Sequence, residues 1–291
     1  MDVGAQPLSR IRDFALTPEG IRRLATANVV ALIVIIASGA TVRLTNSGLG
    51  CHHWPGCTAT DPLPANGLHS YVEFGNRIVS AGVIFVALAT WLFGRGYRRL
   101  AGVIFCLTLA QAPLGAVTVH YHLNPYLVMS HFLLSITVLS LGVILAAQTR
   151  ERMKTPLPPW LPQVGLVVAL SALVLIVSGT LATAAGPHPG SLLVRRLWSF
   201  YPAVYWHVRA TAVFGISFAL VLAMLHRLRA PQIRGGFALL GLLAVQMTIG
   251  EIQYRTQLPW WLVLVHVAVA ATVWAAAVSF VFSLWRPRRM A

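Results

Sequence analysis

Two histidines of this 291-residue chain occupy equivalent places in an internal repeat. Gln111 is followed by an apolar run, a short polar turn, a proline and His131, and Gln246 leads through a similar run and turn to His266. The glutamine and the histidine are 20 residues apart in both copies. A histidine is costly to bury in lipid, so its recurrence at one depth indicates a function. Because imidazoles on facing helices of a bundle can hold a haem, we expect both to be iron ligands.

The composition indicates an integral membrane protein. Hydrophobic residues make up 57% of the chain and charged residues 10%, and the mean hydropathy is +0.73, which excludes an ordinary soluble domain. Eight apolar stretches are long enough to cross a bilayer core of about 30 Å. These predicted spans lie near 24–42, 72–93, 100–119, 126–147, 164–184, 204–225, 237–252 and 260–284. No cleavable signal peptide is expected, because no small-residue cleavage site follows the first apolar run.

The basic residues predict how the chain crosses the membrane. Of the 22 Lys and Arg residues, 16 lie in the two terminal segments and in the second, fourth and sixth connections between spans. The positive-inside rule places these segments, and therefore both termini, in the cytoplasm. The net charge of +15 thus reflects topology, and we expect contact with membrane lipid and no nucleic-acid partner.

The proline-rich connection at 149–163 divides the spans into two sets of four. We therefore expect an all-α integral membrane fold, with eight transmembrane helices arranged as two pseudo-symmetric four-helix bundles. The N-terminal bundle would comprise residues 1–150 and the C-terminal bundle residues 151–291. The unusual chemistry falls in the external connections and at the external ends of the spans.

The first external connection contains Cys51 and Cys57, with Trp54-Pro-Gly56 between them to supply a turn. Thiols outside the cytoplasm tend to oxidise, and a turn can bring their Cα atoms within disulfide range, so we expect a bridge. Two roles remain open for it, a structural staple and a redox-active pair that passes electrons at the site. Cys106, inside the third span, is expected to be a small packing residue.

The same connection resembles a motif of a known family. The segment Arg43-Leu-Thr-Asn-Ser-Gly-Leu-Gly-Cys-His-His-Trp-Pro-Gly-Cys57 is similar to the sequence that follows the first helix of haem A synthases. Further similarities follow in order along essentially the whole chain: Val72-Glu-Phe-Gly-Asn-Arg77, Gln111-x-x-Leu-Gly115, Gly186-Pro-His188, His207 and His266. The resemblance implies an oxidoreductase that converts haem O to haem A for terminal oxidases. A ring methyl would be hydroxylated twice, and the geminal diol would lose water to give a formyl group.

The resemblance also implies surroundings and partners. The enzyme would lie in the bacterial cytoplasmic membrane with its haem sites toward the external face. Haem O would be the substrate, haem A the product and haem b a cofactor. A haem O synthase and a terminal oxidase could be partners, the chain could form homo-oligomers, and the electron acceptor is left open.

The second half matches the family's ligand pattern. His207 opens the sixth span and His266 lies near the start of the eighth, so the two can approach one iron from opposite sides. The resemblance implies that they hold haem b. The alternative is that each histidine is satisfied by a helix carbonyl or by water.

The first half departs from the pattern. Many family members carry a histidine three residues after the glutamate and just before the arginine, where this chain has Asn76 before Arg77. An amide is a poor ligand for haem iron, so His131 would stand alone. The site could then be five-coordinate and open, the alignment of Asn76 could be wrong by a few residues, or a loop histidine could supply a ligand: His69, His120 or His122. We favour an open site, because a substrate porphyrin must enter and leave.

Charged residues near the external ends complete the predicted site. The resemblance makes Glu73 the leading catalytic candidate, placed near the reacting methyl, and the alternative is an ion pair with Arg77 at i+4. Glu251 is expected to pair with Arg255 and to be structural. Arginines outside the cytoplasmic set could bind haem propionates, although Arg195 and Arg196 could equally be solvated loop charges: Arg43, Arg77, Arg195, Arg196 and Arg209.

Two other classes of function remain. The chain could be an electron carrier of the b-cytochrome kind, with haems held permanently in both halves. It could instead be a non-catalytic assembly factor that delivers haem to an oxidase. The missing first-half ligand argues against two permanent bis-histidine haems.

Overall fold

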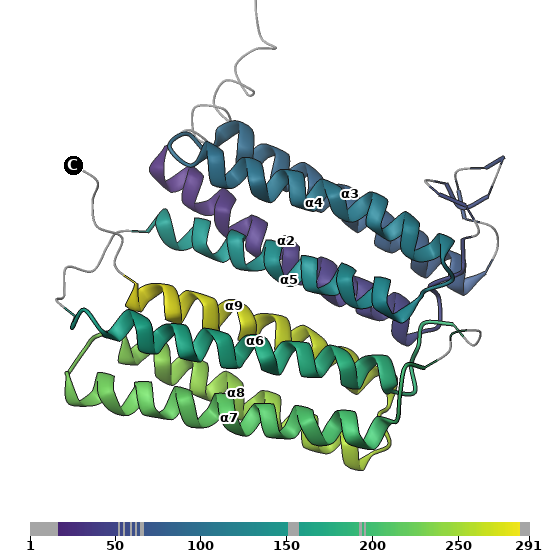
Figure 1. The fold of residues 1–291 in the computed structure, drawn as a ribbon. Helices are drawn as coiled ribbons and strands as arrows, with labels where there is room; N and C mark the ends of the chain where they lie inside the picture. The colour runs from purple at the N-terminus through teal and green to yellow at the C-terminus, as the bar shows by residue number, and fades with distance from the viewer. Residues whose placement is uncertain are drawn as a thin grey trace, which may run out of the picture.

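The computed structural model describes residues 17–285 apart from 52, 55, 59, 62, 65, 66, 151–156, 192, 193 and 195. The regular secondary structure of this described part is helical throughout (Figure 1). Its elements are α2 (Pro18–Leu44), α3 (Leu68–Phe93), α4 (Arg98–His120), α5 (Pro125–Gln148), α6 (Leu161–Ala185), α7 (Phe200–Arg227), α8 (Ile233–Arg255) and α9 (Trp260–Leu284). All eight are long and apolar enough to cross a membrane. The prediction of an all-α integral membrane protein with eight spans is therefore confirmed.

Local sequence signals set several helix ends. Thr17 caps α2 by accepting a hydrogen bond from the Gly20 N–H at 3.0 Å, and Pro18 follows it at the first helical position. Asn124 caps α5 in the same way, with Pro125 next. Such caps lie outside the most apolar windows, and for that reason α2 begins before the predicted span 24–42.

The helices form two groups of four. In Figure 1, α2–α5 lie together in one group and α6–α9 in the other. In the first group each helix packs along both of its neighbours, so that α3 and α5 are diagonal to each other. In the second group α7 and α9 are diagonal, α7 packs closely on α6, and α7 makes few contacts with α8. The second group is thus the more open one along its α7–α8 side.

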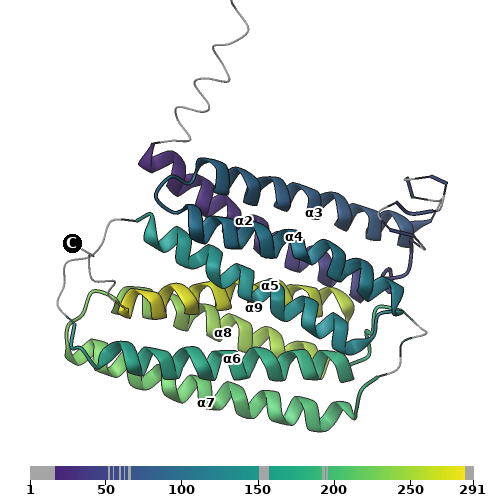
Figure 2. The same cartoon turned by 45° about the horizontal axis from the view of Figure 1, so that its top comes forward.

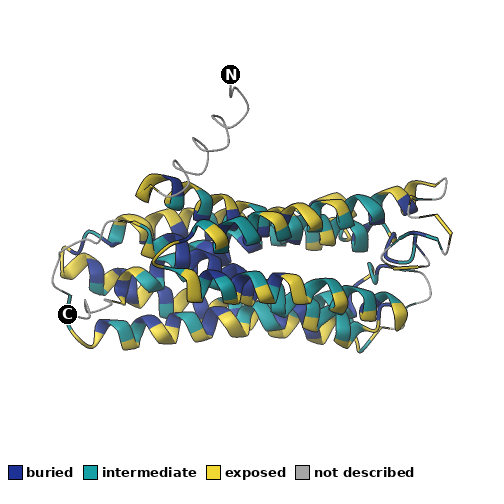
Figure 3. Cartoon of the chain, turned by 90° about the horizontal axis from the view of Figure 1, so that it is seen from above, coloured by how far each residue is buried: buried dark blue, intermediate teal, exposed yellow. Residues whose placement is uncertain are grey.

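Helix α9 joins the two groups. It packs on α2 and α5 as well as on its own neighbours α6 and α8, and Figures 1 and 2 both place it beside α5. The Trp274 indole N–H donates to the Ser140 hydroxyl of α5 at 2.9 Å. Figure 3 shows buried residues concentrated between the groups and exposed residues over the outer helix surfaces.

The outer surface carries many large apolar side chains, as expected for helices that face lipid. Cys106 lies on this surface: it is exposed on α4. The expectation that Cys106 packs inside the protein is therefore wrong. Its helix is apolar on more than one side, so composition alone could not distinguish the inward face from the outward one.

The two short turns at one end of the bundle share an unusual backbone. Between α4 and α5, His122 and Leu123 have φ angles of 51° and 58°. Between α8 and α9, Gln257 and Leu258 have φ angles of 63° and 61°. The first loop with its two cysteines lies at this same end, which we call the disulfide end (Figure 1).

Candidate functional site

Cys51 and Cys57 form a disulfide with a Cα–Cα separation of 4.4 Å, which confirms the predicted bridge. Both cysteines are buried. The chain just before the bridge lies directly on the first turn of α3: a Cβ at Gly50 would be only 2.5 Å from the His69 carbonyl oxygen. Ser70 Oγ donates to the Gly50 carbonyl at 2.7 Å. A side chain larger than hydrogen at position 50 would therefore push the disulfide loop away from the helix.

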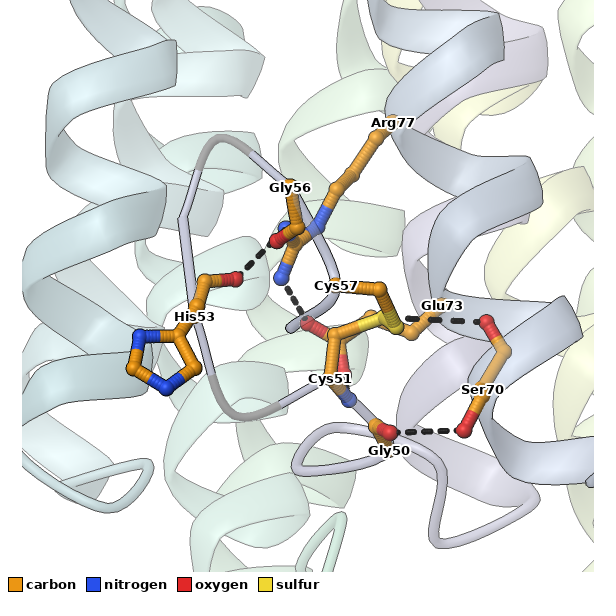
Figure 4. Close-up of polar contacts among 8 residues, drawn as sticks. All are labelled: Gly50, Cys51, His53, Gly56, Cys57, Ser70, Glu73 and Arg77. Atoms are coloured by element: carbon orange, nitrogen blue, oxygen red, sulfur yellow. Dashed lines mark hydrogen bonds and ion pairs between the residues drawn. A yellow bond between two sulfur atoms is a disulfide. The ribbon is translucent and has the colours of Figure 1, made fainter. Parts of the chain in front are cut away.

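Glu73 and Arg77 fasten this loop to α3 (Figure 4). The Glu73 carboxylate is 5% exposed; its Oε2 accepts the Cys51 N–H at 2.9 Å and its Oε1 accepts Arg77 Nη2 at 2.6 Å. Arg77 Nη1 donates to the carbonyls of His53 at 2.9 Å and Gly56 at 2.6 Å. The ion-pair alternative for Glu73 is thus present in the structure. Each carboxylate oxygen has a partner, so Glu73 neutralises Arg77 and positions the disulfide loop.

His131 lies in the first turns of α5 and packs toward α4. A Cβ at Gly115 would be 3.6 Å from its Cε1 atom. Gln111 donates to the Ser135 hydroxyl at 2.8 Å and, more weakly, to the His131 carbonyl at 3.4 Å. The buried Nδ1 of His131 and Oε1 of Gln111 have no hydrogen-bond partner. Unpaired buried polar atoms are rare in folded proteins, so this place is suited to a further ligand.

Asn76 lines a cavity and does not face a partner histidine. The cavity, of about 650 Å³, lies between α2, α3 and α9, and its walls include Ser38, Thr41 and Val265. The Asn76 Oδ1 atom is buried without a partner. His131 is not among the residues that line this space. The first half therefore presents an unpaired amide to an apolar groove that α9, a helix of the second group, helps to close.

Residues of α6 set the orientation of the His207 ring. The Ser178 hydroxyl lies 3.0 Å from His207 Nδ1, which leaves the Nε2 nitrogen for another ligand. A Cβ at Gly179 would be 3.1 Å from His207 Cε1, so the ring lies directly against the helix backbone.

Residues of α8 contact the His266 ring in a comparable way. Gln246 Nε2 lies 3.1 Å from both the His266 Nε2 nitrogen and the His266 carbonyl oxygen. A Cβ at Gly250 would be 3.1 Å from His266 Cε1. The His266 Nδ1 atom is buried and unpartnered. Since α7 and α9 are diagonal helices, His207 and His266 come from opposite sides of the second group.

Each of the three histidines thus has a glycine of the preceding helix beneath its ring: Gly115, Gly179 and Gly250. We call these the ring glycines. Our sequence analysis missed the Ser178-Gly179 pair, although Ser38-Gly39 stands at a matching place in α2 and could have been the signal. The space over Gly39 is empty, with nothing within 4 Å of a Cβ built there.

The histidines expected in loops have contacts of their own, and two of them prove to be helical: His69 lies in the first turn of α3 and His120 is the last residue of α4. His69 Nδ1 lies 3.0 Å from the Ser47 hydroxyl, and His188 Nε2 lies 2.8 Å from the Leu258 carbonyl. His120 contacts the Tyr121 ring edge-on. His122 has the left-handed backbone of its turn. None of these contacts involves His131.

The remaining arginines of the predicted external set differ in their surroundings. Arg255 pairs with Glu251, as predicted, and both side chains are exposed. Arg209 stacks on the Tyr205 ring at 3.4 Å from its centroid. Arg196 is exposed. Arg195, like His52 and Pro55 of the first loop, lies outside the described residues.

Comparison with known proteins identifies the family. The chain matches the family of cytochrome oxidase assembly proteins named COX15-CtaA over residues 22–69 and 66–278. This chain belongs to that family. The heme A synthase of Geobacillus thermodenitrificans is 34% identical over 137 residues, which are 44% of this chain and 43% of the relative. That of Shewanella oneidensis is 30% identical over 145 residues, 43% of this chain and 44% of the relative.

A longer match to a COX15-CtaA relative has lower identity. The heme A synthase of Exiguobacterium sibiricum is 23% identical over 238 residues, which cover 77% of this chain and 73% of the relative. In the more similar relatives the matched part spans less than half of the relative's length. Family membership thus extends over nearly all the described helices.

The donor set of this COX15-CtaA protein fits a haem iron. The described residues contain no group of three or more His, Cys, Asp or Glu side chains that could enclose a metal ion. They do contain histidines on diagonal helices, each held through one ring nitrogen or left with an unpartnered one. Two axial imidazoles are sufficient for an iron whose other four ligands come from a porphyrin.

Proposed function

We propose that this chain acts as a haem A synthase, which oxidises a methyl group of haem O to the formyl group of haem A. The observation that carries the proposal is the arrangement of His207 and His266 on diagonal helices, each ring supported by a glycine and a polar neighbour. Relatives that bear the name heme A synthase support the same assignment.

In the second half, His207 and His266 would hold haem b through their imidazole nitrogens. Ser178 would fix the orientation of the His207 imidazole, because a histidine that is held through Nδ1 presents Nε2 in a defined direction. Gln246 contacts the His266 Nε2 nitrogen, so binding of the iron through that nitrogen would replace this contact. The iron porphyrin would supply the redox chemistry of this half. The protein contributes ligation, orientation and an apolar environment.

In the first half, His131 would bind the iron of the substrate, haem O. Asn76 offers no strong second ligand, so the substrate can dissociate after conversion. The groove beside Asn76, which His131 does not line, is bounded by helices whose outer faces are apolar, so it would suit the approach of a hydrophobic molecule from the membrane. A permanent cofactor and an exchangeable substrate would thus occupy the second and first halves, respectively.

Glu73, Arg77 and the two cysteines would cover the substrate half at the disulfide end. Glu73 remains our candidate for the group near the reacting methyl, and its bonds to Arg77 and to the Cys51 N–H would hold the carboxylate in a fixed position. Arg77 also donates to two carbonyls of the disulfide loop, so it would bind the porphyrin only at the edge of this cover. The structural and redox roles of the disulfide both fit this position.

The protein would function in the bacterial cytoplasmic membrane, with both termini in the cytoplasm and the disulfide end outside. The four-helix groups α2–α5 and α6–α9 would correspond to residues 1–150 and 151–291. A haem O synthase could supply the substrate, a terminal oxidase could take the product, and copies of the chain could associate. Conversion of a methyl to a formyl group removes electrons, so an acceptor must also dock.

Pigment extraction tests the proposed function. The full chain is expressed in cells that contain haem O but lack their own haem A synthase, and the extracted haems are separated by chromatography. We expect haem A to appear. Extraction of haem b alone would indicate an electron carrier, and haem O that remains unconverted on the protein would indicate a delivery factor.

A further inference from the structure

Arg43 lies where the two groups of helices meet at the disulfide end. It belongs to the last turn of α2 and is half-buried. Its Nη1 donates to the carbonyl of Thr183, a residue of α6, at 3.4 Å. Its stem packs under the loop after α6, where a Cβ at Gly190 would be 3.3 Å from Arg43 Cγ. The side chain therefore leaves its own group and reaches into the second one.

The two loops above Arg43 are joined, which fixes its position. The Gly48 N–H donates to the Gly190 carbonyl at 3.1 Å. The Leu123 side chain lies against both glycines, since a Cβ at Gly48 would be 2.7 Å from it and one at Gly190 would be 3.2 Å from it. Gly190 has φ 97°, a conformation that favours glycine. The junction thus covers Arg43 with closely packed backbone.

The charge of Arg43 has no carboxylate partner in the part of the chain that the structure describes. Arg77 and Arg255 each pair with a glutamate, and Arg209 lies on an aromatic ring. Arg43 has one carbonyl contact, at the long limit of a hydrogen bond, whereas a guanidinium carries five N–H donors. The C-terminal ends of α2 and α6 offset part of the charge through their dipoles, but they leave the other donors unused.

The unused N–H donors of Arg43 lie next to the second-half site. Thr183 follows Gly179, the ring glycine under His207, by about one helical turn on α6. Arg43 therefore lies nearer the disulfide end than the rings of His207 and His266, which come from diagonal helices of the second group. A positive group at this place would attract a negatively charged edge of whatever molecule the two histidines bind.

We propose that Arg43 binds a carboxylate of the second-half ligand, a porphyrin propionate, so that the first half supplies part of the second-half site. The inference rests on the proposed function. A guanidinium and a carboxylate can form two parallel charge-assisted hydrogen bonds, which would use donors that the protein itself does not satisfy. Such a bond would also align the porphyrin relative to the junction between the two groups.

The test compares haem b with haem b dimethyl ester, in which both propionates are esterified. The full chain is purified without haem and reconstituted with each compound, and the rate of haem loss to an excess of apomyoglobin is measured. In the unaltered protein we expect the ester to leave about tenfold faster, because a charged hydrogen bond is lost. In Arg43→Gln, haem b should leave about tenfold faster, and esterification should add no further loss.

Two variants complete the design. Arg255→Gln serves as the matched control, because Arg255 is exposed at the same end and pairs with its own glutamate, and it should retain haem b normally. Arg43→Lys keeps the positive charge but lacks the paired N–H donors of a guanidinium, so its rate of haem loss should be intermediate. If Arg43→Gln does not fold, Arg43→Lys and the ester comparison in the unaltered protein still decide the matter.

Three outcomes would overturn the inference. The first is an equal ester effect in the unaltered protein and in the Arg43 variants. The second is an effect of the Arg43 variants that vanishes in vesicles of phosphatidylcholine alone and returns with anionic lipid, which would assign Arg43 to a lipid phosphate. The third is an unaltered protein without a low-spin bis-imidazole spectrum, which would reject the proposed function as well.

Discussion

The two groups of helices carry similar residues at matching places, but they differ on the helix opposite the shared histidine. Each has a glutamine and a ring glycine on one helix and a histidine on the next: Gln111, Gly115 and His131 in the first, Gln246, Gly250 and His266 in the second. The opposite helix of the second group carries His207, held by Ser178, whereas the first group has Asn76 beside a cavity. We propose that Asn76, at the place that His207 occupies in the second group, makes the first half a place for exchange and leaves permanent ligation to the second half.

Removal of a second-half histidine should have the largest effect. His207→Ala or His266→Ala should abolish the low-spin bis-imidazole spectrum of the purified protein, because one axial bond is lost. His120→Ala is the control, since His120 is exposed and its ring packs edge-on against Tyr121. Unchanged absorption spectra in both second-half variants would exclude the pair as ligands.

Replacement of Glu73 should separate a catalytic role from a positioning role. Glu73→Ala leaves Arg77 without its counter-charge, and breaking a buried pair of this kind costs about 3 kcal/mol of the free energy of unfolding. Haem A formation should be lost while haem O still binds. Arg77→Ala loosens the same loop but keeps the carboxylate. If both variants lose conversion to the same extent, Glu73 acts only through the loop.

Asn76→His would make the first half resemble the second. A new imidazole at this position should favour six-coordinate, low-spin iron, so that bound haem O exchanges more slowly. We expect haem content to rise while turnover falls, as measured by haem chromatography together with the spin state. A spin state equal to that of the unaltered protein would mean that residue 76 does not face the iron.

Loss of the disulfide should affect the first half more than the second. Cys57→Ala opens a short loop and should lower the free energy of unfolding by about 2 kcal/mol. The second-half spectrum should be retained, because the loop contacts α3. Full haem A formation by a well-folded Cys57→Ala protein would exclude the redox role and leave only the structural one.

Gly250→Ala should give the smallest effect and tests the ring glycines. Its methyl would lie 3.1 Å from His266 Cε1, so the ring must shift, at a cost of about 1–2 kcal/mol. The second-half haem should show a displaced absorption band or reduction potential. Gly241→Ala on the same helix meets nothing within 4 Å and should leave both unchanged. Equal behaviour of the two variants would show that Gly250 has no special role.

Features set by local spacing were predictable from the sequence. The eight spans follow from hydropathy, and the Glu73–Arg77 and Glu251–Arg255 pairs follow from the i+4 geometry of a helix. The disulfide followed from two cysteines around a turn.

Features set by how helices cross were not predictable. The outward face of Cys106, the wall that α9 gives to the Asn76 cavity and the reach of Arg43 to α6 all depend on packing between distant segments. No local pattern records which of several apolar faces turns inward, so these contacts had to come from the structure. The roles of the site residues stay predictions until the variants above are measured.

The position of α9 has a thermodynamic consequence. One stretch of this helix carries His266 toward α8, while Leu264, Val265 and Ala268 line the Asn76 cavity. A molecule that fills the cavity must press on the same turns that aim the imidazole. If filling either half changes the energy of α9, the other half must respond by an equal free energy, because linkage is reciprocal. Titrating one half while recording the signal of the other would measure that energy directly.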